Sequence, residues 1–299
     1  MLLTRRALLL GAGSLALATP PGLGAYAVGV EPRLPARVTR YRITPPRWPD
    51  GVALRIVALS DIHACEPWMS PERVRAIALA ANALRPDVIA LLGDYNAGHP
   101  YVTAPVLPEQ WGEALSVLRA PLGVFGVLGN HDWWHGPVPG MPGNTDEVRR
   151  GLRLAGARVL ENDLVPLDKD GRRIWLAGLA DQIAYLQPGV GPRGADDLPG
   201  TLRGVTDEAP VVVLMHEPDL FAGMTDRVAL ALSGHTHGGQ VIVPGFGAPF
   251  TPSRLFLYGH YQSTRRHMIV SAGLGESGFP ARFGMPPEIV VVDLGSAAA

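Results

Sequence analysis

Short apolar runs alternate along the chain with segments in which apolar residues recur at helical spacing. The runs are rich in Val, Ile and Leu, as in strands buried on both faces, and predict strands over residues 54–59, 88–92, 124–128, 211–215 and 228–232. Strands that alternate with helical segments indicate an α/β fold.

Two helix starts are visible between the apolar runs. Ser70 and Pro71 predict a helix whose buried face carries Val74, Ile77, Ala78 and Ala81. Asn144 with Glu147 predicts a second helix, whose apolar positions are Val148, Leu152 and Ala155.

The first thirty residues have the pattern of an export signal or a membrane span. An uncharged run from Ala7 to Val30 follows Arg5 and Arg6, which resembles the bacterial twin-arginine signal. Residues 25–27 have the small-x-small form of a signal-peptidase site, so cleaved and retained forms both stay open. A buried core helix is disfavoured because the run opens the chain behind two arginines. We expect residues 1–30 to direct the protein out of a bacterial cytoplasm, to the periplasm or cell envelope.

The rest of the chain divides into a linker, one domain and a short tail. Residues 31–49 contain five prolines and five arginines without a periodic apolar pattern, which predicts a linker. Residues 50–295 are long enough to bury a sizeable core and are expected to form the catalytic domain, and residues 296–299 a tail.

Composition excludes several classes of protein. Lys and Arg number 26 against 27 Asp and Glu, for a net charge of -1, so no overall positive field attracts duplex nucleic acid. The single cysteine, Cys65, excludes an internal disulfide and a cysteine-based zinc finger, and is expected to be a small buried side chain. Any metal must therefore take nitrogen and oxygen ligands.

Each of the five predicted strands is followed by side chains able to bind a metal ion. They are Asp61 and His63, then Asp94, then Asn130 with His131 and Asp132, then His216, and finally His235 and His237. Ligands in open α/β sheets bind beyond the carboxyl ends of strands, so these side chains are expected to converge on one metal centre.

The local spacing of these residues supports convergence. In an extended chain Asp61 and His63 face the same side, as do His235 and His237. A glycine precedes Asp94, Asn130 and His235, where it would let the backbone turn sharply and approach an ion closely.

These motifs resemble the full motif set of the calcineurin-like metallophosphoesterases. The resemblance runs from about Val52 to Leu294. The twin-arginine start and the extension Gly234–Gln240 are similar to the exported YkuE/YaeI-type phosphoesterases, relatives of UDP-2,3-diacylglucosamine pyrophosphatases. The resemblance implies an α/β fold with four layers, an α-β-β-α sandwich of two mixed sheets.

The resemblance also implies a dinuclear site. It places Asp94 as the bridge, with Asp61, His63 and His237 in the first metal site and Asn130, His216 and His235 in the second. This donor set suits two divalent ions of Mn, Fe or Zn. The implied activity is phosphoric ester hydrolysis by a phosphodiesterase or pyrophosphatase, in which a hydroxide between the metals attacks phosphorus.

His131 and Asp132 are the expected catalytic residues. The resemblance gives His131 a role beside the metals, either bonding the phosphoryl oxygens or protonating the leaving group. We expect Asp132 to orient His131 and to favour its protonated form, the alternative being a helix or turn cap.

The substrate is less sharply indicated. Trp68, Trp133 and Trp134 form either an apolar rim for an acyl chain or membrane, or ordinary loop packing. Arg254, Arg265 and Arg266 either meet a phosphate or form a solvated face. The expected partners are a small or lipid-linked phosphoester, a membrane through the N-terminal segment, and the twin-arginine machinery.

Two other functions compete with a phosphoesterase of this kind. A non-catalytic metal-binding scaffold on the same fold is disfavoured because every ligand and His131 are present. A nuclease with the same motifs needs a basic groove, for which the charge balance offers little support.

Overall fold

The computed structural model of the chain describes residues 20–138, 140–253 and 255–295. Arg5, Arg6, Arg254 and the tail at 296–299 lie outside them. Helix α2 (Pro20–Gly29) covers the rest of the N-terminal segment. No helix within the described residues has both the length and the apolar character needed to cross a membrane.

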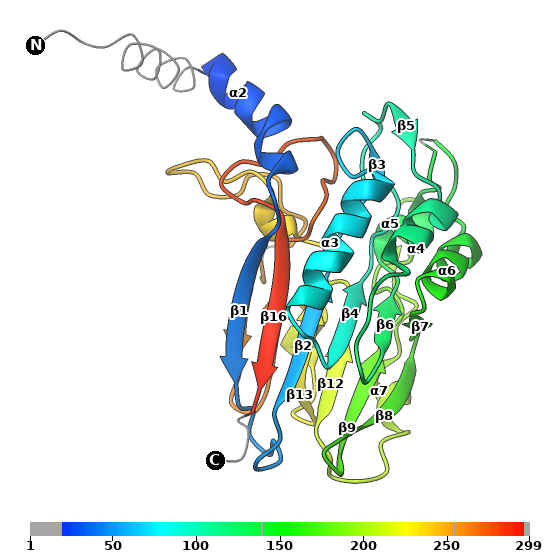
Figure 1. The fold of residues 1–299 in the computed structure, drawn as a ribbon, viewed down its shortest axis with the longest axis vertical. Helices are drawn as coiled ribbons and strands as arrows, with labels where there is room; N and C mark the ends of the chain where they lie inside the picture. Colours follow the sequence, from blue (N-terminus) through cyan, green and yellow to red (C-terminus); the bar gives the residue numbers. More distant parts are fainter. Residues whose placement is uncertain (1–19, 139, 254, 296–299) are drawn as a thin grey trace, which may run out of the picture.

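Two six-stranded sheets form the body of the protein (Figure 1). The first contains, in order, β1 (Arg37–Ile43), β16 (Glu288–Leu294), β2 (Leu54–Leu59), β4 (Val88–Leu92), β6 (Val124–Val127) and β7 (Arg158–Val159). The second contains β14 (Gly259–Gln262), β15 (His267–Val270), β13 (Val228–Ser233), β12 (Val211–Leu214), β9 (Arg172–Gly178) and β8 (Asp163–Lys169). Each sheet is mixed, since β16 runs antiparallel to β2, and β14 and β8 run antiparallel to their neighbours.

The alternation of side chains along each strand produces the layers. In β2, Val57 and Leu59 face helices α3 (Pro71–Ala83), α4 (Pro108–Leu115) and α6 (Thr145–Leu154), which cover the first sheet. Ile56 and Ala58 face the second sheet, against residues such as Val212 and Leu230. The outer face of the second sheet has a thinner cover, made by α7 (Leu198–Leu202) and the 3-10 turn η2 (Pro218–Gly223). This is the four-layer sandwich expected from the resemblance.

The predicted strands and helix starts are confirmed. The five apolar runs are β2, β4, β6, β12 and β13, each within one residue of its predicted boundaries. Ser70 caps α3 by accepting a hydrogen bond from the Arg73 N–H, and Asn144 caps α6 by accepting from the Asp146 N–H. The residues predicted to form the apolar face of α3 are all buried.

The prediction of a linker over residues 31–49 is corrected by β1. This strand pairs in parallel with β16 along its whole length, from Arg37 with Glu288 to Ile43 with Leu294. It lies at the edge of the first sheet (Figure 1), so most of its side chains are polar and partly exposed, and it lacks the dense apolar run that marks a central strand. The folded domain therefore begins before residue 50.

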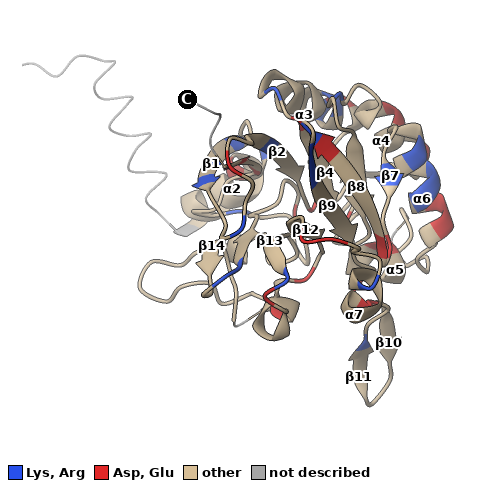
Figure 2. Cartoon of the chain, turned by 90° about the horizontal axis from the view of Figure 1, so that it is seen from below, with Lys and Arg blue, Asp and Glu red and all other residues tan. Residues whose placement is uncertain are grey.

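The remaining elements lie mainly beyond the carboxyl ends of the parallel strands. They include β3 (Cys65–Glu66), β5 (Ala104–Pro105), α5 (Asn130–Trp134), η3 (His237–Gly239) and a hairpin of β10 (Tyr185–Gln187) and β11 (Gly191–Arg193). Figure 2 shows this hairpin projecting from the body, whereas α6 carries charges of both signs.

Candidate metal centre

The segments that follow five strands converge on one buried centre. Asp61 and His63 follow β2, Asp94 follows β4, and Asn130 opens α5 directly after β6. His216 follows β12, while His235 and His237 follow β13. Six of these seven side chains are almost fully buried, and that of His235 is partly exposed. The structure thus brings together all seven residues expected to hold metal.

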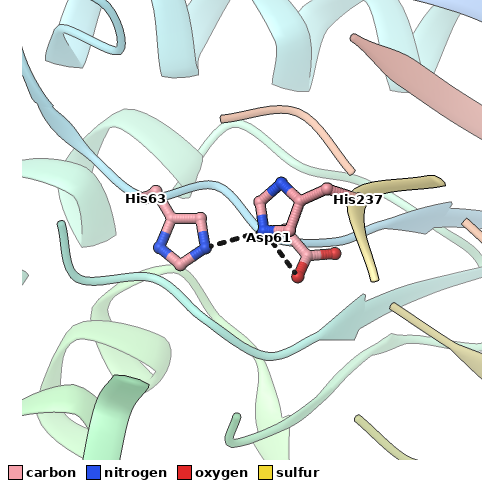
Figure 3. A group of neighbouring side chains, drawn as sticks. All are labelled: Asp61, His63 and His237. Carbon is pink, nitrogen blue, oxygen red and sulfur yellow. Dashed lines mark hydrogen bonds and ion pairs between the residues drawn. The ribbon is translucent and has the colours of Figure 1, made fainter. Parts of the chain in front are cut away.

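The first group contains Asp61, His63 and His237, whose ligand atoms lie within 4.8 Å of one another (Figure 3). His237 Nε2 lies 3.5 Å from Asp61 Oδ1 and 3.2 Å from His63 Nε2. Two neutral imidazoles whose Nε2 lone pairs point at the same place are suited to bind one cation together.

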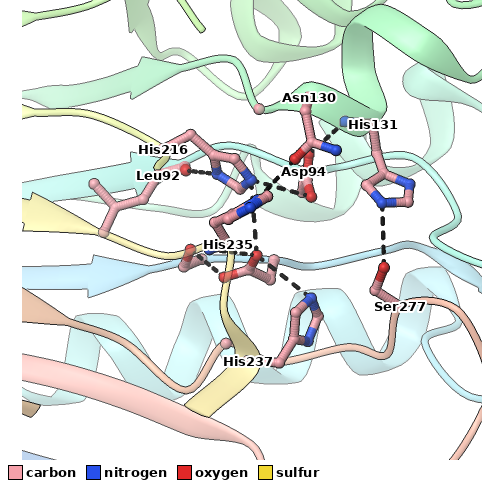
Figure 4. A network of polar contacts seen from close by, with 12 residues as sticks. Leu92, Asp94, Asn130, His131, His216, His235, His237 and Ser277 are labelled. Atoms are coloured by element: carbon pink, nitrogen blue, oxygen red, sulfur yellow. Dashed lines mark hydrogen bonds and ion pairs between the residues drawn. The ribbon is translucent and has the colours of Figure 1, made fainter. Parts of the chain in front are cut away.

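The second group lies beside the first (Figure 4). His216 Nε2 is 3.1 Å from Asp94 Oδ2 and 4.0 Å from Asp61 Oδ1. His235 Nδ1 is 2.9 Å from Asn130 Oδ1.

Asp94 connects the two groups through a single oxygen. Its Oδ2 lies 3.5 Å from His63 Nε2 and 3.1 Å from His216 Nε2. Its Oδ1 accepts a hydrogen bond of 2.9 Å from the backbone N–H of His131. The carboxylate is therefore held by one oxygen and presents the other to both groups, which is the placement a bridging ligand requires.

The backbone at the centre differs from the extended geometry expected from the sequence. Asp61, His63, Asp94, His235 and His237 all have positive φ, between 46° and 71°. Non-glycine residues rarely adopt this conformation, and several together mark a site where function dictates the backbone. Asp61 and His63 reach the same centre because the chain curls there, so the expectation of a continued extended strand was wrong.

The three glycines that precede ligands are needed for close packing. A Cβ on Gly129 would lie 2.3 Å from Asp94 Oδ1, and one on Gly234 would lie 2.4 Å from Asp61 Oδ2. Gly93 also has a φ of +96° and would place a Cβ 2.7 Å from His216 Nδ1. Any side chain at these positions would displace a ligand, which is the close approach predicted from the sequence.

Backbone carbonyls fix the orientation of two imidazoles. His63 Nδ1–H donates to the Asn96 carbonyl at 2.8 Å, and His216 Nδ1–H donates to the Leu92 carbonyl at 2.7 Å. Both rings therefore turn Nε2 toward the centre. His216 Nε2 is buried without a hydrogen-bond partner, as expected for an atom whose natural partner is a cation.

Electrostatics favour the neutral form of three candidate ligands, which is the form that binds metal. Burial lowers the pKa of His63 and of His235 to about 3, and burial next to His63 and Arg282 lowers the pKa of His237 well below its usual range. These imidazoles are neutral at pH 7 and free to act as ligands.

The carboxylates concentrate negative charge at His216. Burial opposes ionisation of Asp94, but the positive charge of the neighbouring His216 outweighs it and holds the pKa of Asp94 well below its usual range. Burial also opposes charge on His216, yet Asp94, Glu217 and Asp61 raise the pKa of His216 well above its usual range. A centre that stabilises a positive charge at this point fits divalent cations, so the residues present match the metal pair that the motifs imply.

Glu217 is a nearby acid that sequence reasoning missed. Its Oε1 lies 3.8 Å from His235 Nδ1, is buried, and has no hydrogen-bond partner. Glu217, His216 and His235 form a third group able to hold a cation. Burial and the neighbouring Glu217 raise the pKa of Asp181 to about 10, and burial also raises the pKa of Glu217. The only signal in the sequence was adjacency to His216.

Asp132 does not orient His131. Its carboxylate oxygens accept hydrogen bonds from the backbone N–H groups of Gly129, Asp94 and Tyr95, each at 2.9 Å. The capping alternative is therefore the one its contacts support: Asp132 ties the segment after β6 to the segment after β4. Burial moreover lowers the pKa of His131, contrary to the expected stabilisation of its protonated form.

Ser277 makes the contact with the His131 side chain that was expected of Asp132. Its hydroxyl lies 3.1 Å from His131 Nε2, while His131 Nδ1 is buried without a partner (Figure 4). The Ser277 N–H donates to Gln240 Oε1 at 2.8 Å, which anchors the serine. A lone serine in a loop carried no signal that could have identified it.

A cavity of about 810 Å³ opens beside the centre. Asp94, His131 and His235 lie on its wall together with Trp134, whose Nε1–H donates to the Ile183 and Ala184 carbonyls. Trp134 is thus the tryptophan among the three we considered that lines the cavity.

The other residues considered for substrate binding lie elsewhere. Arg266 forms an ion pair with Asp226 at 2.7 Å, and Arg265 lines a separate small pocket, so neither lines the cavity beside the centre. Cys65 is fully buried, and burial raises the pKa of its thiol to about 12, as fits a structural side chain.

A buried arginine and glutamate support the loop under His237. Arg282 donates hydrogen bonds to the carbonyls of Gly275, Ala272 and Met285. Glu276 lies 3.9 Å from Arg282, and both of its carboxyl oxygens are buried without hydrogen-bond partners.

Replacing Glu276 with glutamine is expected to remove a pH dependence of stability. Burial raises the pKa of Glu276 to about 7, so the folded chain binds this proton more tightly than the unfolded chain. The resulting stability is present at low pH and is lost as the pH rises through 7. Urea unfolding at pH 5 and pH 8 should show Glu276→Gln gaining about 2 kcal/mol over wild type across this interval. The exposed Glu208→Gln is the control, and an equal gain there would contradict the assignment.

Comparison with known proteins points to one family. A sequence profile described as calcineurin-like phosphoesterase matches residues 54–239. The chain is 33% identical over 298 residues to the uncharacterized metallophosphoesterase YkuE of Bacillus subtilis (strain 168), covering 96% of this chain and 94% of that protein. It is 28% identical to an uncharacterized metallophosphoesterase of Aquifex aeolicus (strain VF5), covering 86% and 91%. It is also 29% identical to phosphodiesterase YaeI of Escherichia coli (strain K12), covering 82% and 83%.

Proposed function

The chain belongs to the calcineurin-like phosphoesterase family, hydrolases that act on phosphoester bonds, and on that premise we propose that it is a dinuclear metal-dependent phosphodiesterase. The observation that carries the dinuclear assignment is the single Asp94 oxygen shared between His63 and His216. Two divalent cations bound there would supply an activated water and neutralise charge on the phosphoryl oxygens. Asp61, His63 and His237 would hold one ion, and Asn130, His216 and His235 the other.

The charge of the cavity favours a diester over a monoester. Asp196, Glu217 and Asp219 line it, and no Lys or Arg does so among the described residues. A phosphate diester carries one negative charge and a monoester carries nearly two at neutral pH, so the diester meets less repulsion from these carboxylates. The E. coli relative named a phosphodiesterase supports the same choice.

His131 is the side chain proposed to bind the phosphoryl group beside the metals. Its backbone N–H is tied to Asp94, and Ser277 holds its Nε2, so the ring is fixed beside the shared carboxylate. Burial keeps the imidazole neutral, and its Nδ1 has no partner in the protein. A neutral imidazole in this place can donate its N–H to a phosphoryl oxygen and so stabilise the charge that develops there.

Hydrolysis of two aryl phosphates tests the proposal. Purified protein loaded with Mn²⁺ is expected to cleave bis-p-nitrophenyl phosphate with a kcat/KM at least about tenfold above that for p-nitrophenyl phosphate. Removal of metal by a chelator should abolish both activities, and Mn²⁺ should restore them. Protein with full metal and no activity on either ester would favour the scaffold alternative, and a preference for the monoester would overturn the charge argument.

We also propose that the protein is exported to the cell envelope through the twin-arginine route. Arg5 and Arg6 before an uncharged run support this, and the ligands come together only in the folded chain, so metal loading must accompany folding. Arg5→Lys with Arg6→Lys is expected to leave the protein in the cytoplasm on fractionation, while Arg40→Lys with Arg42→Lys, on the edge strand, should not change its location. An unchanged location of the first variant would contradict export by this route.

A further inference from the structure

Exposed apolar side chains are concentrated at one end of the molecule. Most of the large exposed hydrophobic side chains of the described residues lie in α2, directly after α2, or in the segments that follow the carboxyl ends of β4, β6, β9 and β13. The exceptions are Val38, Leu79 and Leu154. The two most exposed, Phe246 at 86% and Val190 at 82%, are on separate loops. Patches of this kind on a soluble surface mark an interaction site.

Long stretches of three loops at this end also lack charge. Residues 95–107, 183–192 and 238–253, which we call the loop face, contain no Asp, Glu, Lys or Arg. Surface loops normally carry charge. The turns at the opposite end follow that rule, since residues 84–87, 168–172 and 203–208 each contain both acidic and basic side chains. The contrast within one chain shows that composition alone does not explain the loop face.

Two of the three stretches of the loop face line the cavity. Ile183 and Pro192 come from the segment that contains the β10–β11 hairpin, and Phe250 and Pro252 from the segment after η3, and all four line the cavity. The β10–β11 hairpin projects from the body (Figure 2), and its residues Leu186 and Val190 are exposed. A surface that contacted these loops would therefore lie directly over the entrance to the candidate site.

Helix α2 packs against the domain at the same end of the molecule. The Arg282 N–H donates to the Ala27 carbonyl, and the Trp68 Nε1–H donates to the Val28 carbonyl, which ties α2 to loops beside the centre. In Figure 1, α2, β3 and β5 lie at the upper end of the molecule. Helix α2, which belongs to the uncharged run from Ala7 to Val30, therefore lies on the side of the loop face.

We propose that the loop face inserts into the surface of a lipid bilayer, where the cavity takes a lipid phosphodiester. The second part rests on the proposed phosphodiesterase activity. Single apolar side chains on the tips of separate, uncharged loops suit a fluid apolar layer, which each tip can enter alone. A protein partner would instead favour a continuous packed core within a polar rim. Burying an uncharged loop also avoids the cost of desolvating ions.

Fluorescent labelling tests insertion at individual positions. Because Cys65 is buried, a cysteine introduced at an exposed site is the one that a thiol-reactive environment-sensitive dye modifies readily. Val190→Cys and Phe246→Cys place the dye on two tips without altering the residues that line the cavity. Leu79→Cys, an exposed apolar position on α3, is the matched control. Each labelled full-length protein is mixed with phosphatidylcholine vesicles, and melting temperatures verify that each variant is folded.

Vesicles should shift the emission of the dye to the blue and increase its intensity at least about twofold at positions 190 and 246, with no change at 79. A lipid-borne quencher should reduce emission only at the two tips. Absence of a shift at the tips, or an equal shift at all three positions, would overturn the proposal, and the second result would point to attachment through another part of the chain. These readouts do not depend on catalysis, so they separate failure of docking from failure of the proposed phosphodiesterase activity.

Discussion

Asp94→Asn is expected to reduce hydrolysis of bis-p-nitrophenyl phosphate by at least about 1,000-fold and to lower the metal content of the purified protein. The asparagine oxygen cannot satisfy both sides of the site. If it faces His63 and His216, the amide nitrogen meets the backbone N–H of His131, which is also a donor. If the amide is reversed, its N–H₂ group points at the two cation positions. Either orientation removes the negative charge that the two groups share.

Metal analysis and titration calorimetry would measure the loss alongside kcat. Asp170→Asn, an exposed carboxylate in the turn between β8 and β9, is the control and should retain both metal and activity. An Asp94→Asn protein with two ions and nearly full activity would show that Asp94 is not the shared ligand.

His131→Ala is expected to lower kcat by about 100-fold while the metal content stays unchanged. The prediction follows from the position of His131, whose side chain lies on the cavity wall and forms no hydrogen bond with any of the seven candidate ligands, since its Nε2 meets Ser277 and its Nδ1 is unpaired. Metal content and kcat on an aryl phosphate ester would be measured on the same preparation.

Two neighbouring substitutions sharpen this test. Ser277→Ala removes the partner of Nε2 and should cause a smaller fall in kcat, because the imidazole stays in place but is less firmly oriented. His135→Ala, an exposed histidine just after the same helix, should stay within about threefold of wild type. Loss of metal from His131→Ala would show that His131 is a ligand instead.

The seven candidate metal ligands could be recognised in the sequence because each of them follows a strand that is buried on both faces. Dense apolar runs identify such strands, and a polar residue with metal-binding capacity directly after one is conspicuous, as with Asp94 after β4. The same reasoning failed for β1, whose edge position leaves its side chains polar and half exposed. It also misjudged the backbone at Asp61 and His63, because positive φ at non-glycine residues is imposed by the surroundings.

Residues whose role depends only on their contacts in the folded protein could not be recognised in the sequence. Ser277 lies 146 residues from His131, and Arg282 lies 45 residues from His237. A serine in a loop and an arginine among many arginines are chemically ordinary, and only packing places them beside a ligand or a catalytic imidazole. Asp132 shows the converse, because adjacency to His131 suggested a partner, while the helix turn directs its carboxylate to backbone N–H groups instead.

The amino-acid sequence by itself determined the central strands, two helix starts, the likeness to a phosphoesterase family and the seven candidate ligands, since burial and donor chemistry are written in residue type and order. Tertiary structure alone decided that one oxygen of Asp94 faces both ligand groups, that Ser277 and not Asp132 meets His131, and that uncharged stretches of two loops line the cavity. These features depend on which segments the two sheets bring side by side. Contacts between residues more than a hundred positions apart arise from packing and carry no local pattern.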